Sequence, residues 1–156
     1  MRTDGIRIHL DQESSAVILD PETVRRLAAA VQAREGGGLR VAVHVVGDER
    51  MRELHARHLG VEETTDVISF DLRGGDDPEP CPEDVDGEIF VNAPMAVREA
   101  RSRGHDPRTE LLFYVAHGLY HLLGYDDATP EARAAMLDRQ AACLADLGLK
   151  MEADWR

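Results

Sequence analysis

The residues best suited to chemistry are two histidines, His117 and His121, four positions apart in an apolar segment. In a helix, side chains at i and i+4 rise from the same face one turn apart, so two imidazoles can share a metal ion. The H-E-x-x-H zinc motif uses the same spacing. Without a metal, two buried imidazoles would need two separate partners or would carry a desolvation cost. Tetrahedral zinc needs at least one more protein ligand, and a catalytic site keeps a position open for water.

A third ligand is expected just beyond the helix. Gly124 allows a sharp turn at the helix end, and Asp127 lies ten positions after the first histidine, where the third ligand falls in H-x-x-x-H-x-x-G-x-x-H sites. A carboxylate oxygen is an acceptable zinc ligand. Asp126 and Asp127 could instead favour the start of the next helix, but Thr129 is the better-placed cap, which leaves one Asp free. We therefore predict one zinc ion per chain, held by both histidines and Asp127.

The residue after the first histidine limits which hydrolytic reactions the site is expected to catalyse. It is Gly118, so the general base of H-E-x-x-H proteases is absent, and peptide hydrolysis lacks an obvious proton acceptor. Gly118 is expected to leave space beside the metal for a bulky substrate. Glu88 and Asp66, near the ends of two expected strands, are candidate proton-handling groups, although solvation of turns and strand ends explains them equally well.

The elements that must position these residues can be read from the hydrophobic pattern. The segment 107–123 is apolar on almost every face, which is typical of a helix buried in the middle of a domain. The strands 65–72 and 87–92 could pair as an antiparallel hairpin with a long loop. The other expected elements are strands at 6–10 and 39–47, and helices from 21 to the glycine run at 36–38, at about 50–58, at 93–103 and from 130 onward.

This order of elements, β-α-β-α-β-β-α-α-α, predicts an α/β (α+β) fold. We expect a small mixed four-stranded sheet packed with about five helices, one of them a central buried metal-binding helix. A chain of 156 residues fits a single domain, residues 1–156. Only two cysteines occur, in no C-x-x-C arrangement, and no leader or membrane-spanning run is visible. A cytoplasmic protein without a membrane partner is expected.

Charge is unevenly spread along the chain. The formal net charge of −12 weighs against a protein that coats nucleic acid through a general basic surface. Residues 74–88 carry much of the negative charge and have the composition of a mobile loop. Two groups of basic residues keep contact with nucleic acid open, although solvated helix faces are the preferred interpretation: Arg50, Arg52, Arg57 and His58 in the first, and Arg98, Arg101, Arg103, His105 and Arg108 in the second.

The segment from His117 to Asp127 reads HGLYHLLGYDD, which agrees with ten of the eleven positions of H-G-x-x-H-L-x-G-Y-D-H. That pattern is the signature of the YbeY family of bacterial endoribonucleases, which this chain resembles over about residues 39–147. TDVISF (65–70) and DGEIFVN (86–92) are similar to two strands of the family. Glu110 and the spacing from Met136 to Gln140 also fit the resemblance.

The resemblance implies one zinc held by three residues and hydrolysis of single-stranded RNA. It also implies a role in ribosomal RNA processing, notably maturation of the 16S rRNA 3′ end, with the small ribosomal subunit as a partner. Asp127 stands where the family has a third His; as a harder, anionic ligand it should lower the Lewis acidity of the metal.

A second departure from the family lies upstream of TDVISF. His55 and Leu59 stand where the family has Asn and Arg, and that Arg is assigned to phosphate contact. Arg57 and His58 are candidate substitutes from neighbouring positions, and Ser69 is a further candidate for substrate binding.

Three hypotheses for function follow. The leading one is a single-strand-specific, zinc-dependent endoribonuclease acting in rRNA processing and ribosome biogenesis. The second is a metal-dependent hydrolase of another substrate, proteases included. The third is a ribosome-associated RNA- or protein-binding module with a structural metal, which the carboxylate ligand and the missing Arg favour.

Overall fold

The computed structural model describes residues 5–73 and 85–150. Its strands and helices follow the predicted order. The strands are β1 (Ile6–Gln12), β2 (Leu39–Val46), β3 (Val67–Asp71) and β4 (Gly87–Asn92). The helices are α1 (Pro21–Glu35), α2 (Asp48–Leu59), α3 (Ala93–Arg103), α4 (Pro107–Leu122) and α5 (Pro130–Asp146). Most of the predicted mobile loop, residues 74–84, lies outside the described residues.

The four strands form one mixed sheet in the order β1-β2-β4-β3. β1 pairs with β2 and β2 with β4 in parallel, while β3 runs antiparallel to β4. In that last pair Val67 lies opposite Val91 and Asp71 opposite Gly87. The predicted α+β class, the mixed sheet and the antiparallel pairing of the last two strands are therefore confirmed.

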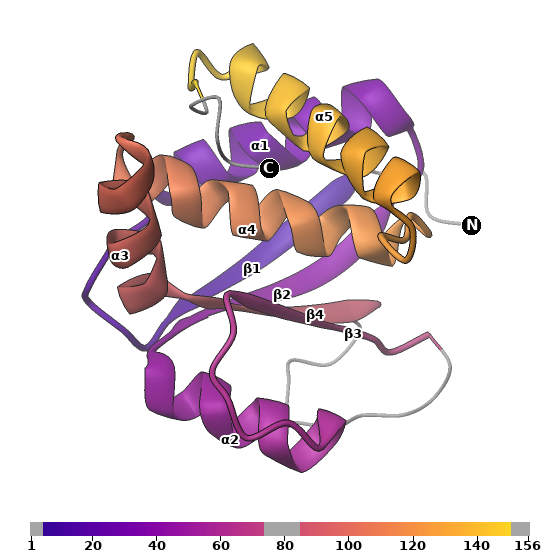
Figure 1. The fold of residues 1–156 in the computed structure, drawn as a ribbon. Coiled ribbons are helices and arrows are strands. Elements are labelled where there is room, and N and C mark those ends of the chain that lie inside the picture. Colours follow the sequence, from indigo (N-terminus) through magenta and orange to yellow (C-terminus); the bar gives the residue numbers. More distant parts are fainter. Residues whose placement is uncertain (1–4, 74–84, 151–156) are drawn as a thin grey trace.

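Successive side chains along a strand point to opposite faces of the sheet, so the buried apolar residues form two cores, one on each face. Ile89 and Val91 of β4 belong to the larger core with α1, α4 and α5, whereas Phe90 packs with Met51 and Leu54 of α2. Figure 1 shows the resulting layers: α4 crosses one face of the sheet, α5 lies outside it, and α2 covers part of the opposite face. None of the helices in the described part of the chain is long and apolar enough to cross a membrane.

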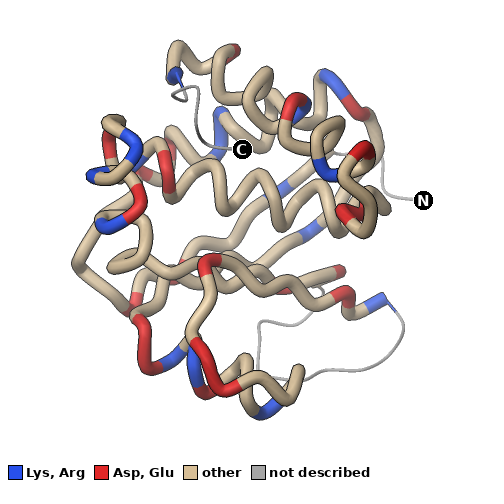
Figure 2. Tube along the Cα trace, viewed as in Figure 1, with Lys and Arg blue, Asp and Glu red and all other residues tan. Residues whose placement is uncertain are grey.

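Helix α4 is the buried central helix that the sequence predicts, and its trace is almost free of charged residues in Figure 2. It approaches β4 so closely that a Cβ at Gly118 would lie 2.7 Å from Cγ2 of Ile89. Real Cβ atoms essentially never come that close. Gly118 is thus required for packing against the sheet. The expectation that it leaves space beside the metal is wrong, because its missing side chain would point toward β4.

Candidate metal centre

His117, His121 and Asp127 come together as predicted. Nε2 of His117 lies 3.1 Å from Nε2 of His121, and Oδ2 of Asp127 lies 3.5 and 3.6 Å from these two nitrogens. Zinc bonds of about 2.0–2.1 Å in a tetrahedron separate ligand atoms by about 3.3–3.4 Å. The three atoms already have nearly this separation, so the donor set fits a tetrahedral divalent metal.

The turn after α4 brings the carboxylate back over the histidines. Gly124 adopts φ +102°, a left-handed conformation that favours glycine, and so confirms the predicted sharp turn. Asp126 accepts a hydrogen bond from the amide of Ala128 at 3.1 Å, and Thr129 caps α5 through the amide of Ala132 at 3.0 Å. Asp126 and Thr129 are thus engaged in backbone hydrogen bonds, and Asp127 is the aspartate that faces the imidazoles.

Tyr125 anchors this turn to α1. Its hydroxyl donates to Oε1 of Glu35 at 2.6 Å, and the guanidinium of Arg139 lies over its ring, 5.0 Å from the centroid. Burial raises the pKa of Glu35, but hydrogen bonds from Tyr125 and Tyr120 outweigh it, so the pKa lies below its usual value. The carboxylate stays charged near neutral pH and holds the metal-binding turn in place.

The ring orientation of His117 is set by Gln140 on α5. Oε1 of Gln140 lies 2.9 Å from Nδ1 of His117, while its Nε2 donates to the carbonyl of Phe113 at 3.4 Å. The oxygen therefore accepts the Nδ1 proton and leaves the Nε2 lone pair free for a metal. Burial holds the pKa of His117 below its usual 6.5, and the His121 ring adds to this against the opposing Gln140 bond. The imidazole is thus neutral, as a ligand must be.

The triad lies on the floor of an open cleft of about 460 Å³. Helix α4 forms the floor of the cleft. The end of α2 and strand β3 form one wall, and side chains of α3 and α5 complete the lining. The lining residues are His55, Leu59, Asp66, Val67, Ile68, Ser69, Arg103, Phe113, Tyr114, His117, His121, Asp127, Arg133 and Leu137.

The other predicted site residues divide between inside and outside this cleft. Asp66 and Ser69 line it. Glu88 does not: it is fully buried and bonded to Nε2 of His44 at 2.8 Å, on the sheet face away from α4. Arg57 and His58 are not among the lining residues either; His58 packs edge-on against Phe70. Of the two proton-handling candidates, Asp66 lines the cleft that holds the triad, whereas Glu88 is buried beside His44 on the other face of the sheet.

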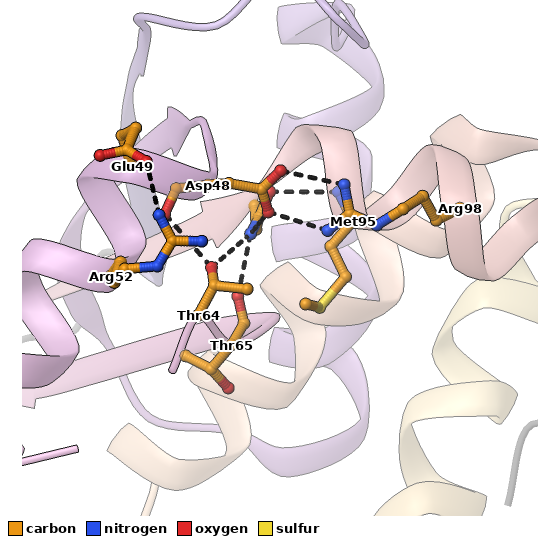
Figure 3. Close-up of polar contacts among 8 residues, drawn as sticks. Asp48, Glu49, Arg52, Thr64, Thr65, Met95 and Arg98 are labelled. Atoms are coloured by element: carbon orange, nitrogen blue, oxygen red, sulfur yellow. Dashed lines mark hydrogen bonds and ion pairs between the residues drawn. The ribbon is translucent and has the colours of Figure 1, made fainter. Parts of the chain in front are cut away.

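A polar network holds the segment that leads into β3, and Figure 3 shows it. Nδ2 of the buried Asn92 lies 2.9 Å from Asp48 Oδ1 and 3.1 Å from both Thr64 Oγ1 and the Thr65 carbonyl. Asp48 also forms a two-pronged ion pair with Arg98 at 2.8 and 2.9 Å, which lowers the pKa of Asp48 to about 2. These bonds tie α2, α3 and β4 together and fix the backbone beside Asp66.

Sequence reasoning missed two arginines that line the cleft. Arg103 was placed on a solvated helix face, but it reaches the cleft and pairs with the fully buried Glu110 at 2.6 Å. Arg133, in the first turns of α5, lies 3.7 Å from Oδ2 of Asp127. No local sequence motif marks either arginine as a cleft residue, because the position of each side chain depends on how α3 and α5 pack against α4.

Fold and site together define a small α+β domain with a His-His-Asp triad in an open cleft, and the donor spacing of this triad fits a divalent metal ion. Comparison with known families identifies the family. The sequence model described as Endoribonuclease YbeY matches residues 9–148 of this chain. The chain therefore belongs to the YbeY family of endoribonucleases.

Individual relatives agree with this assignment. The Endoribonuclease YbeY of Moorella thermoacetica is 40% identical over 135 residues, covering 82% of this chain and 86% of that protein. The Geobacillus kaustophilus Endoribonuclease YbeY is 35% identical over 152 residues, covering 90% and 94%. A solution structure of a Thermotoga maritima protein is 25% identical, with a TM-score of 0.57, and covers 92% of this chain and 91% of its own.

Proposed function

We propose that this protein is a zinc-dependent endoribonuclease that cleaves single-stranded RNA, and that it acts in the cytoplasm in maturation of the 16S rRNA 3′ end. The observation that supports this most is the near-tetrahedral spacing of His117, His121 and Asp127 in an open cleft, in a chain of the YbeY family. The proposal takes residues 1–156 as one domain, since the described elements all pack around one sheet.

The proposed chemistry divides roles among this chain's residues. His117, His121 and Asp127 would hold one zinc ion, which would supply Lewis acidity toward a phosphate oxygen and toward an attacking water. Gln140 orients His117 through Nδ1. Asp66 is the carboxylate in the cleft that could take up a proton; its Oδ1 accepts the amide of Val67 at 2.8 Å, which fixes its side chain.

Substrate selection follows from the shape and charge of the cleft. Ser69 on the β3 wall offers a hydroxyl, and Leu59, 56% exposed at the mouth, offers apolar surface. The cleft encloses about 460 Å³, and its lining includes side chains of both α2 and α5, so a single strand is easier to accommodate there than a duplex. These features support single-strand specificity.

Cleavage assays on matched RNAs test the proposal. A single-stranded oligoribonucleotide should be cut internally, the same sequence annealed to its complement should be cut far more slowly, and chelator should stop both reactions. Zinc should restore activity at about one equivalent per chain. Intact single-stranded RNA under all of these conditions would refute the nuclease assignment.

Ribosomal RNA as the natural substrate needs a separate experiment. Precursor 16S rRNA with an extended 3′ end, supplied within small ribosomal subunits, should be shortened by the wild-type protein and not by His121→Ala. If the protein co-sediments with subunits but leaves this RNA and all oligonucleotides intact, the binding-module hypothesis replaces the present one. The replacement of the family's third His by Asp127 is the observation that favours that alternative.

A further inference from the structure

Two arginines stand near opposite ends of the cleft floor. Arg103 at the end of α3 pairs with Glu110, in the first turn of α4, and Arg133 of α5 lies beside Asp127 at the far end of that helix. Glu110 lies seven positions before His117 and eleven before His121 on α4, which corresponds to about 10 and 16 Å along the helix axis. This separation is longer than one phosphate group and suits a strand of several nucleotides.

Both arginines remain accessible despite their ion pairs. The side chain of Arg103 is 26% exposed and that of Arg133 is 51% exposed. Arg103 contacts Glu110 through Nη1 at 2.6 Å and Glu99 through Nη2 at 3.2 Å. A guanidinium carries five N–H donors in a planar fork and binds phosphate oxygens well. The two carboxylates thus hold the Arg103 head at the cleft without occupying all of its donors.

The position of Arg133 differs in one respect. Its Nη1 lies 3.7 Å from the same Asp127 oxygen that faces both histidines. A phosphodiester held at the triad would therefore lie within reach of Arg133. Arg103, beside Glu110 at the other end of the floor, is too far along α4 to share that phosphodiester.

We propose that single-stranded RNA lies along α4, with Arg133 contacting the phosphodiester that is cut and Arg103 contacting a phosphate further along the strand. This inference rests on the proposed function. It gives the chain a way to hold the RNA backbone although Leu59 occupies the position where the family has Arg. The RNA strand would then run along the cleft from the metal centre toward the end of α3.

Substrate length tests the assignment of Arg103. With a dinucleotide, which has one phosphodiester and cannot reach α3, Arg103→Gln should lower kcat/KM much less than it does with a longer substrate. With an oligonucleotide of about ten residues, the same variant should show a KM roughly three- to tenfold higher at unchanged kcat. The salt dependence of binding to that oligonucleotide should weaken by about 0.7 in log–log slope, as one phosphate contact is lost.

Arg101→Gln is the matched control, because Arg101 lies on α3, is exposed and does not line the cleft. It should leave KM for both substrates unchanged. Arg103→Lys keeps a cation beside Glu110 and should show a smaller rise in KM for the long substrate alone, which guards against misfolding of the glutamine variant.

The outcomes separate this inference from the proposed function. If wild type cleaves RNA but neither Arg103 variant changes KM for the long oligonucleotide, or both variants lose activity equally on the two substrates, the inference is overturned and the nuclease assignment stands. If the wild type cleaves neither substrate, the proposed function fails and the inference fails with it.

Discussion

Oε1 of Gln140 on α5 lies 2.9 Å from Nδ1 of His117 on α4, and this contact decides which ring nitrogen of His117 faces the other ligands. Gln140 is fully buried, and its amide is oriented in turn by the carbonyl of Phe113. Helices α4 and α5 are therefore coupled at the centre of the site by both hydrogen bonds of the Gln140 amide.

Replacing Gln140 should weaken metal binding without removing any ligand. In Gln140→Leu the Nδ1 proton of His117 loses its acceptor, so zinc affinity should fall by about 10- to 100-fold. Competition against a chromophoric chelator measures this. Gln140→Glu keeps an acceptor at the same place and should retain most of the affinity; equal affinity in wild type and the leucine variant would show that Gln140 does not orient the ligand.

Gly118 should be intolerant of even one added methyl group. In Gly118→Ala the new Cβ would meet Cγ2 and Cδ1 of Ile89 at 2.7 and 2.8 Å, so α4 must move away from β4. We expect a loss of about 1–3 kcal/mol in the free energy of unfolding, measured by urea denaturation. Gly47→Ala is the control, since Gly47 has φ −102° and no atom within 4 Å of an added Cβ. Similar stability losses in both variants would contradict the packing role.

His44 should make folding stability depend on pH. Burial lowers its pKa, but the hydrogen bonds to Glu88 and Asp11 outweigh burial, so the pKa lies above the usual 6.5. A group whose pKa is raised on folding stabilises the native state below its unfolded pKa, and this contribution is lost as pH rises through the folded pKa.

The free energy of unfolding should therefore decrease as pH rises from about 6.5 through the folded-state pKa of His44. Urea denaturation across this range measures the decrease, and His44→Gln should remove it. His9→Gln removes an exposed histidine on the neighbouring strand β1 and serves as the matched control substitution. A profile that is the same in wild type and His44→Gln would refute the assignment.

Much of the fold and the metal site follows from local sequence patterns. The i, i+4 histidines, the glycine turn and the capping Thr129 are contained within thirteen consecutive residues, so their geometry depends on one helix end. The strands and helices are likewise set by short-range periodicity. For this reason the element order, the antiparallel pairing of β3 with β4 and the approach of Asp127 to both histidines could be predicted.

The remaining features depend on how distant elements pack. Glu88 was expected near the site because of its place in the chain, but the register of β4 turns it to the opposite face, where it meets His44. Arg103 reaches the cleft only because α3 packs along α4. Gly118 has a packing role that depends on the helix-to-sheet distance. No local pattern encodes any of these three.

Zinc content and RNA cleavage, measured together on two adjacent aspartate variants, test the central claim most directly. Asp127 faces the two histidines, whereas Asp126 caps the turn beside it. We predict about one zinc per chain and cleavage of single-stranded RNA in the wild type and in Asp126→Asn, with zinc binding weakened and cleavage abolished in Asp127→Ala. A wild type that binds no divalent metal, or an Asp127→Ala protein that cleaves RNA as fast as wild type, would contradict the account.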